Sequence, residues 1–69
     1  MKVSYDREID AMYIALEDAK SGRVKQTIAL NDDLIVDFDG NKKIVGIEIL
    51  AASKNLTKKE FKQVEKAVA

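Results

Sequence analysis

Residues 33–50 read DLIVDFDGNKKIVGIEIL and carry the strongest structural signal in the chain. Apolar residues alternate with other residues on both sides of Asp39-Gly40-Asn41, and these three residue types tolerate the positive φ angles of tight turns. This pattern is typical of two antiparallel strands joined by a short loop, so it predicts a β-hairpin. We expect a two-residue turn at Asp39-Gly40 or at Gly40-Asn41.

The same pattern predicts how the two strands pair. A turn centred on Gly40-Asn41 pairs Val36 with Val45 and gives both strands a common apolar face. The members of that face are Leu34, Val36, Phe38, Val45, Ile47 and Ile49. A three-residue loop would turn the apolar residues of the two strands to opposite faces, so we expect a loop with an even number of residues.

Shorter alternating segments precede this hairpin. Residues 3–5 and 11–17 alternate in the same way, and the charged residues 6–10 between them suit a hairpin loop. Residues 24–30 form a further alternating segment, in which Gln26 interrupts the apolar face. We therefore expect an edge strand or a β-bulge at Gln26.

The C-terminal segment predicts a helix over residues 56–68. Thr57 is a suitable N-cap, Glu60 three residues later completes a capping box, and Leu56 with Phe61 forms a hydrophobic staple. The apolar stripe of this helix consists of Phe61, Val64 and Val68. An isolated helix of this length is unstable, so we expect it to lie on the apolar face of the sheet or on a partner.

These elements predict an α+β fold. We expect one domain over residues 1–69, in which an antiparallel sheet of about five short strands, connected as hairpins, occupies residues 1–50. One C-terminal helix packs on it. The chain has no proline and three glycines, and no part of it resembles an interdomain linker.

The composition excludes several classes of function. Cysteine and histidine are both absent, which rules out disulfides, thiolate or imidazole metal ligands, and catalysis by Cys or His. Twelve basic residues balance twelve acidic ones. Residues 1–53 hold seven basic and ten acidic side chains, a net charge of −3, whereas residues 54–69 have a net charge of +3. The chain as a whole therefore lacks the strong field that attracts nucleic acid or membranes.

The size of the chain also carries expectations. A domain of 69 residues gains only about 3–5 kcal/mol from its core, so we expect a homodimer. The N-terminal residues contain no apolar stretch long enough for a signal peptide or a membrane span. We expect a cytoplasmic prokaryotic protein that binds no membrane and no cofactor.

The carboxylates of the hairpin resemble a calcium loop in their spacing. Asp37, Asp39, Asn41 and Glu48 occupy relative positions 1, 3, 5 and 12, but Lys42 stands where such a loop needs glycine. We interpret the segment as a hairpin without a metal. An alternative is a carboxylate and metal-dependent enzyme, which requires the oxygens of Asp37, Asp39 and Glu48 to converge.

Glu48 stands in an otherwise apolar strand, so it needs a partner if its face is covered. We expect a structural ion pair with Lys42, Lys43 or Arg7 rather than a catalytic role.

The predicted helix has a basic side composed of Lys58, Lys59, Lys62 and Lys66. We interpret it as a solvated face, because no aromatic residue lies among these lysines to stack on bases. The alternative is a nucleic-acid-contacting accessory protein, in which Lys58, Lys59, Lys62 and Lys66 bind phosphates.

Two stretches of the chain resemble a known family. Residues 5–14, YDREIDAMYI, and residues 45–53, VGIEILAAS, are similar to the two signature stretches of the domain of unknown function 2283 family of small prokaryotic proteins. The resemblance extends from about Val3 to Ser53. It implies no established activity, cofactor or catalytic residue. Members of the family often lie beside genes for small toxin-like proteins of the ribonuclease type, which implies an antitoxin-like protein with a small toxin-type partner.

The remaining hypothesis is surface recognition. We interpret the chain as a non-catalytic protein-interaction module that binds through an exposed strand edge or through the second face of the sheet. The candidate residues of that second face are Ile35, Ile44, Gly46 and Leu50. Gly46, in the middle of a strand, predicts a bulge or the close approach of another backbone.

Overall fold

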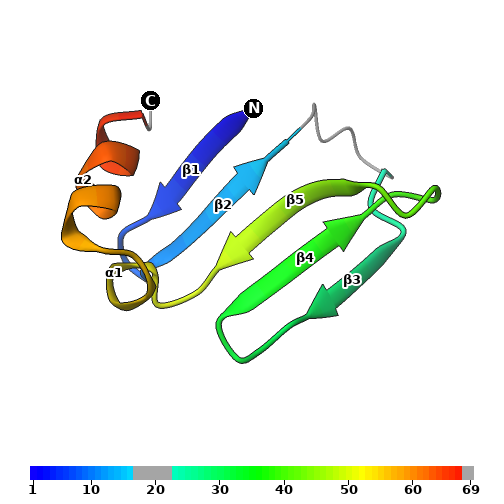
Figure 1. Ribbon diagram of the computed structural model, residues 1–69, viewed down its shortest axis with the longest axis horizontal. Coiled ribbons are helices and arrows are strands. Elements are labelled where there is room, and N and C mark those ends of the chain that lie inside the picture. Colours follow the sequence, from blue (N-terminus) through cyan, green and yellow to red (C-terminus); the bar gives the residue numbers. More distant parts are fainter. Residues whose placement is uncertain (17–22, 68–69) are drawn as a thin grey trace.

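The computed structural model describes residues 1–16 and 23–67. They form five strands and two helices (Figure 1). The strands are β1 (Lys2–Asp6), β2 (Ala11–Ala15), β3 (Gln26–Ala29), β4 (Leu34–Phe38) and β5 (Ile44–Ile49), and the helices are α1 (Ala52–Asn55) and α2 (Lys58–Ala67). The predicted α+β class with a five-stranded antiparallel sheet is confirmed.

All strand pairs are antiparallel, in the order β1-β2-β5-β4-β3 (Figure 1). The last strand in the sequence is therefore the central one in the sheet. β3 is an edge strand, as the polar Gln26 indicates, and it begins at Gln26 rather than at Val24.

The β4–β5 hairpin differs from the prediction in its turn. Val36 pairs with Ile47, not with Val45, and three residues separate Asp39 from Lys43. The Asp39 N–H donates to the Lys43 carbonyl at 2.9 Å, and the Lys42 N–H donates to the Asp39 carbonyl at 3.2 Å. Lys42 adopts the left-handed conformation, with φ of 63°. The expected two-residue turn was wrong, because a type I turn followed by one left-handed residue closes the hairpin instead.

A β-bulge restores the common apolar face that this loop would otherwise scatter. Asp37 pairs with Gly46 and Phe38 pairs with Ile44, so that Val45 is an extra residue on β5. Val45 is only 2% exposed. The expectation of an even loop assumed that nothing else changes the register, and the bulge makes an odd loop compatible with the same face.

The predicted capping box is present at the start of α2. The Glu60 N–H donates to the Thr57 hydroxyl at 3.1 Å, and the Thr57 N–H donates to the Glu60 carboxylate at 3.0 Å. These bonds lower the pKa of Glu60. The prediction of a single C-terminal helix is corrected by α1, which starts after Ala51 in the left-handed conformation, with φ of 48°. The predicted end of the helix at Val68 lies outside the described residues.

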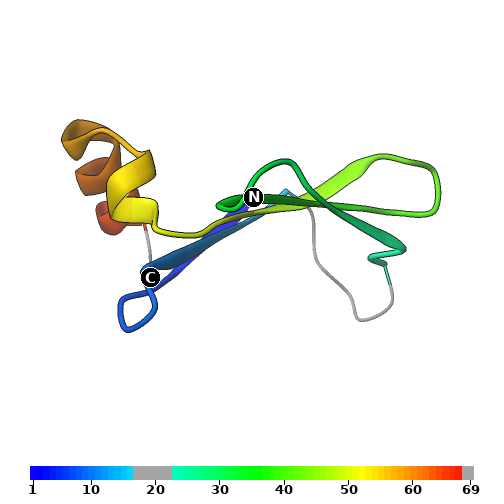
Figure 2. The ribbon, with the colours of Figure 1, turned by 90° about the horizontal axis from the view of Figure 1, so that it is seen from below.

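The helices lie over one end of the sheet. Figure 2 shows both of them on the same side of the sheet at the β1 end, whereas no helix lies above β4 and β3. α2 contacts β1, where the rings of Tyr5 and Phe61 meet edge to face with centroids 5.2 Å apart. The helix therefore covers the apolar face only in part. The core of the described residues is correspondingly small and consists of Ala11, Met12, Val36, Val45 and Ala52.

Candidate functional site

The strand register assembles an apolar surface on one side of the sheet. Directly paired residues share a face, and successive pairings form rows across the strands. One row crosses all five strands and consists of Val3, Ile14, Ile47, Val36 and Ile28. The adjacent row consists of Tyr5, Met12, Ile49 and Leu34. These nine residues are called the first face. Its long row contains only β-branched aliphatic side chains, which have restricted χ1 angles.

The two ends of the first face differ in how well they are covered. At the helical end, Met12 is 1% exposed and Ala52 of α1 is completely buried. At the other end, Ile28 on β3 is 39% exposed. The bulge adds Ile44 to this end, because it sets Ile44 opposite Phe38, and Ile44 is 46% exposed. We call the part of this surface on β5, β4 and β3 the open part of the first face.

A hollow of about 200 Å³ lies where the open part meets α1. It is lined by Asn31, Asp33, Leu34, Ile49, Asn55 and Leu56. Drug-sized ligands occupy cavities of roughly 300–1,000 Å³, so this hollow is too small for most of them.

The opposite face of the sheet, called the second face, carries a hydrogen-bonded group of polar side chains. The Tyr13 hydroxyl donates to one oxygen of Asp37 at 2.8 Å, and the Thr27 hydroxyl donates to the other oxygen at 2.8 Å. Burial and the neighbouring Asp37 carboxylate raise the pKa of Tyr13. The group joins β2, β4 and β3, so it passes across the central strand.

Gly46 is the residue over which Tyr13 crosses β5. A Cβ atom at position 46 would overlap the hydroxyl group of Tyr13, so only glycine leaves room for this side chain. The sequence predicts a bulge or a close approach at this position. The bulge lies one residue away at Val45, and the close approach is made by a side chain of the same chain rather than by another backbone.

The four predicted residues of the second face do not form one patch. Ile35 lies on the second face, half-buried. Gly46 is buried beneath Tyr13 and offers no surface of its own. Ile44 lies opposite Phe38 and therefore on the side of the first face, and Leu50 follows the end of β5.

The carboxylates of the enzyme alternative have separate structural roles. Asp37 accepts the hydroxyls of the second face, whereas Asp39 accepts the N–H groups of Asn41 and Lys43 at 2.8 and 3.0 Å. These backbone bonds lower the pKa of Asp39. Within residues 1–16 and 23–67, no three or more acidic side chains are placed to bind a metal ion.

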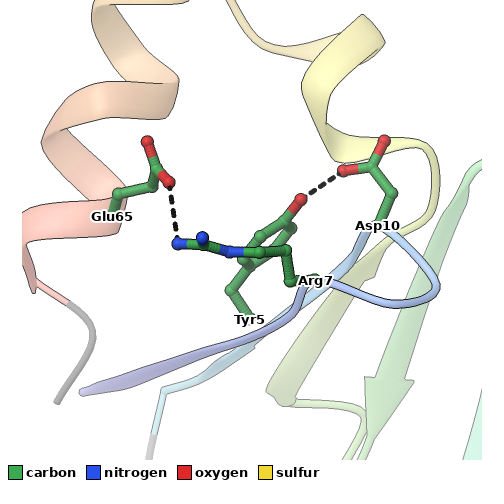
Figure 3. A network of polar contacts seen from close by, with 4 residues as sticks. All are labelled: Tyr5, Arg7, Asp10 and Glu65. Carbon is green, nitrogen blue, oxygen red and sulfur yellow. Dashed lines mark hydrogen bonds and ion pairs between the residues drawn. The ribbon is translucent and has the colours of Figure 1, made fainter.

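Glu48 does not form the expected ion pair. In the described part of the chain it makes no salt bridge with Lys42, Lys43 or Arg7. Arg7 instead pairs with Glu65 of α2 at 3.5 Å (Figure 3). The lysines of the basic helix side, Lys58, Lys59, Lys62 and Lys66, are all exposed on α2.

Asp10 forms a junction that sequence reasoning did not find. Its carboxylate accepts the Tyr5 hydroxyl at 2.6 Å (Figure 3) and the Ser53 hydroxyl at 2.6 Å. The backbone N–H of Ser53 also donates to it, at 3.1 Å, and the Asp10 carbonyl accepts the N–H of Ala52 at 2.9 Å. The bonds from Ser53 and Tyr5 lower the pKa of Asp10, and the bond to Asp10 raises the pKa of Tyr5.

This junction joins the first hairpin to the start of α1. Asp10 has a φ of 53°, so its left-handed backbone aims the carboxylate at α1. The signal in the sequence was the pair of stretches that resemble the family, because Tyr5 and Asp10 lie in one of them and Ser53 in the other. The charged hairpin loop is thus a structural contact as well as a solvated turn.

The family described as protein of unknown function (DUF2283) matches residues 2–53 of this chain. The chain belongs to this family. The part matched by the DUF2283 family contains all five strands and the Asp10–Ser53 junction, and it ends before α2. An uncharacterized protein of Methanocaldococcus jannaschii is 50% identical over 54 residues, which are 78% of this chain and 43% of that relative. The chain thus matches less than half of the relative's length.

No solved structure matches the chain. Among the described residues, neither helix has the length and apolar character needed to cross a membrane.

Proposed function

We propose that this chain is a non-catalytic protein-interaction module that binds another polypeptide through the open part of the first face. The observation that supports this function is the row of five β-branched side chains across the sheet, which the helices cover only at the β1 end. Within this surface Val36 is 7% exposed, and the exposed apolar side chains are Ile28 and Ile44. Exposed apolar surface on a small domain marks a site of interaction.

The shape of the open part of the first face favours a protein over a small molecule, because the hollow beside it is smaller than an ordinary ligand pocket. A larger hollow of about 430 Å³ lies at the β1–β2 end of the sheet, away from the open part. The second face is a weaker candidate than the sequence alone predicts, because Tyr13, Asp37 and Thr27 satisfy one another there. A small toxin-type protein, the partner class implied by the family resemblance, is one polypeptide that an aliphatic surface would accept.

The absence of cysteine makes a direct test of the binding face possible, since an introduced cysteine is the only thiol. Ile28 and Ala29 are adjacent exposed residues of β3 whose side chains lie on opposite faces. We would purify I28C and A29C and label each separately with a maleimide photo-crosslinker. Each labelled chain is added to a cell extract at the concentration of the natively expressed chain and irradiated, and the adducts are identified by mass spectrometry. We expect I28C to form an adduct with one defined polypeptide and A29C to form none.

The polypeptide found in the adduct is then tested as a purified ligand. Its affinity for the wild-type chain should fall at least about tenfold in I28K, because the lysine places a charge in an apolar contact, and should be unchanged in A29K. Equal adducts from I28C and A29C, or equal loss of affinity in I28K and A29K, would contradict the proposed function.

A further inference from the structure

The isolated chain exposes more surface than a complete domain of its mass. Its accessible area is 5301 Å². Folded monomers of 7.7 kDa expose about 4,300 Å², so the excess is about 1,000 Å². A standard protein interface removes about 800 Å² from each partner. The excess is similar in size to the area that one interface removes from each chain.

The core of the described residues is incomplete in the same way. Met12 and Val45 are the two largest side chains that are fully buried, and the other buried apolar residues are Ala11, Val36 and Ala52. A sheet becomes stable when a second layer covers its apolar face, and here the helices supply that layer only over the β1 end. The missing layer is needed for the chain's own fold, which points to an occupant that is present wherever the chain is made.

We infer that the open part of the first face is covered by the first face of a second copy of this chain, in a two-fold symmetric dimer. This inference rests on the proposed function, since it names the polypeptide that the same surface binds. A two-fold interface places one surface against itself, and a row of β-branched aliphatic residues is self-complementary. The net charge of the chain is zero, so two copies do not repel each other.

The positions of the helices restrict how the two sheets face each other. Because α1 and α2 rise from the sheet at the β1 end, the second sheet lies over β5, β4 and β3 (Figure 2). A two-fold axis along the strands near β4 meets this condition. It places β3 of each copy over β5 of the other, at the usual sheet-to-sheet distance of about 10 Å. Each free β3 edge then points toward the helices of the other copy.

Analytical ultracentrifugation of the purified chain tests this inference. We expect a particle of twice the chain mass of 7.7 kDa at micromolar concentration. In I28K the dissociation constant of the dimer should rise at least about tenfold, whereas A29K should leave it unchanged. Circular dichroism of each variant shows whether its sheet is retained.

A second measurement decides the case in which I28K fails to fold. Chain labelled at I28C is mixed with ¹⁵N-labelled wild-type chain and irradiated, and mass spectrometry should find light–heavy dimers joined between first faces. A29C should give none. A folded wild-type monomer at micromolar concentration, or a dimer that A29K disrupts and I28K does not, overturns the inference. A folded monomer whose I28C adduct contains a different polypeptide overturns the dimer and supports the proposed function.

Discussion

Polar side chains on the second face of the sheet bond to one another, whereas the first face leaves aliphatic side chains exposed at its β3 end. Across the second face, Tyr13 and Thr27 donate to the same carboxylate of Asp37 over a glycine, so these three polar side chains satisfy one another. The first face has no such closure at its β3 end, where Ile28 is 39% exposed. A small domain can therefore leave an apolar surface uncovered even when every strand of its sheet is correctly paired.

The largest effect is expected where the first face is already covered. Met12 is 1% exposed at the helical end, so M12A should lower the free energy of unfolding by about 2–5 kcal/mol through lost burial and a residual cavity. Urea denaturation at one protein concentration measures this change. V24A, at a residue that is 40% exposed, is the control and should change the free energy by less than about 0.5 kcal/mol. A loss below about 1 kcal/mol in M12A would show that the helical end is open in solution.

An intermediate effect is expected on the second face at Gly46. In G46A the new methyl group displaces Tyr13 from Asp37, which should cost about 1–3 kcal/mol. The control is a double-mutant cycle with Y13A, since removing the ring removes the overlap. The two substitutions together should then cost less than the sum of their separate effects. Additive costs would contradict the assignment of Gly46 to the passage of Tyr13.

Much of the fold could be predicted from local patterns. Alternation and turn residues predicted the β4–β5 hairpin, and the capping box placed the start of α2 close to Thr57. The turn itself could not be predicted, because the loop and the bulge at Val45 each change the register by one residue and their effects cancel. The alternation of apolar residues shows only the final register of the two strands, in which both changes are already combined.

The features missed by sequence reasoning depend on contacts between distant parts of the chain. Asp10, in the loop of the β1–β2 hairpin, holds the start of α1. The residues around Ala51 therefore carry no local signal that predicts the start of a helix. The shared face of Leu34, Val36, Ile47 and Ile49 was predicted correctly, but the side on which Ile44 lies and the cover of the face were not. Periodicity tells which residues share a face, whereas the position of α2 depends on the contact between Tyr5 and Phe61.

The smallest effect is expected at Asp10, and it depends on pH. Tyr5 carries the only hydroxyl group of the first face, and that hydroxyl donates to Asp10. The pKa of Asp10 is lowered in the folded chain, so its charged form stabilises the fold above an ordinary aspartate pKa of about 4. This contribution is lost as the pH falls through the lowered pKa. The sign therefore predicts that D10N is less stable than wild type at pH 7, and that the two chains become similar in strong acid.

Asparagine is the appropriate replacement at position 10 because it tolerates a φ of 53°. D10N removes the charge and also replaces one of the two carboxylate oxygens that accept the Tyr5 and Ser53 hydroxyls with an amide donor. Denaturation of both chains from pH 7 to pH 2 measures the difference, and D32N, at an exposed aspartate of a different loop, controls for the change in net charge. A D10N curve that stays parallel to wild type down to pH 2 would mean that the hydroxyl groups of Tyr5 and Ser53 do not depend on the charge. Backbone geometry would then hold Tyr5 in place at the β1 end of the first face. The two faces would differ only in the apolar area that they expose.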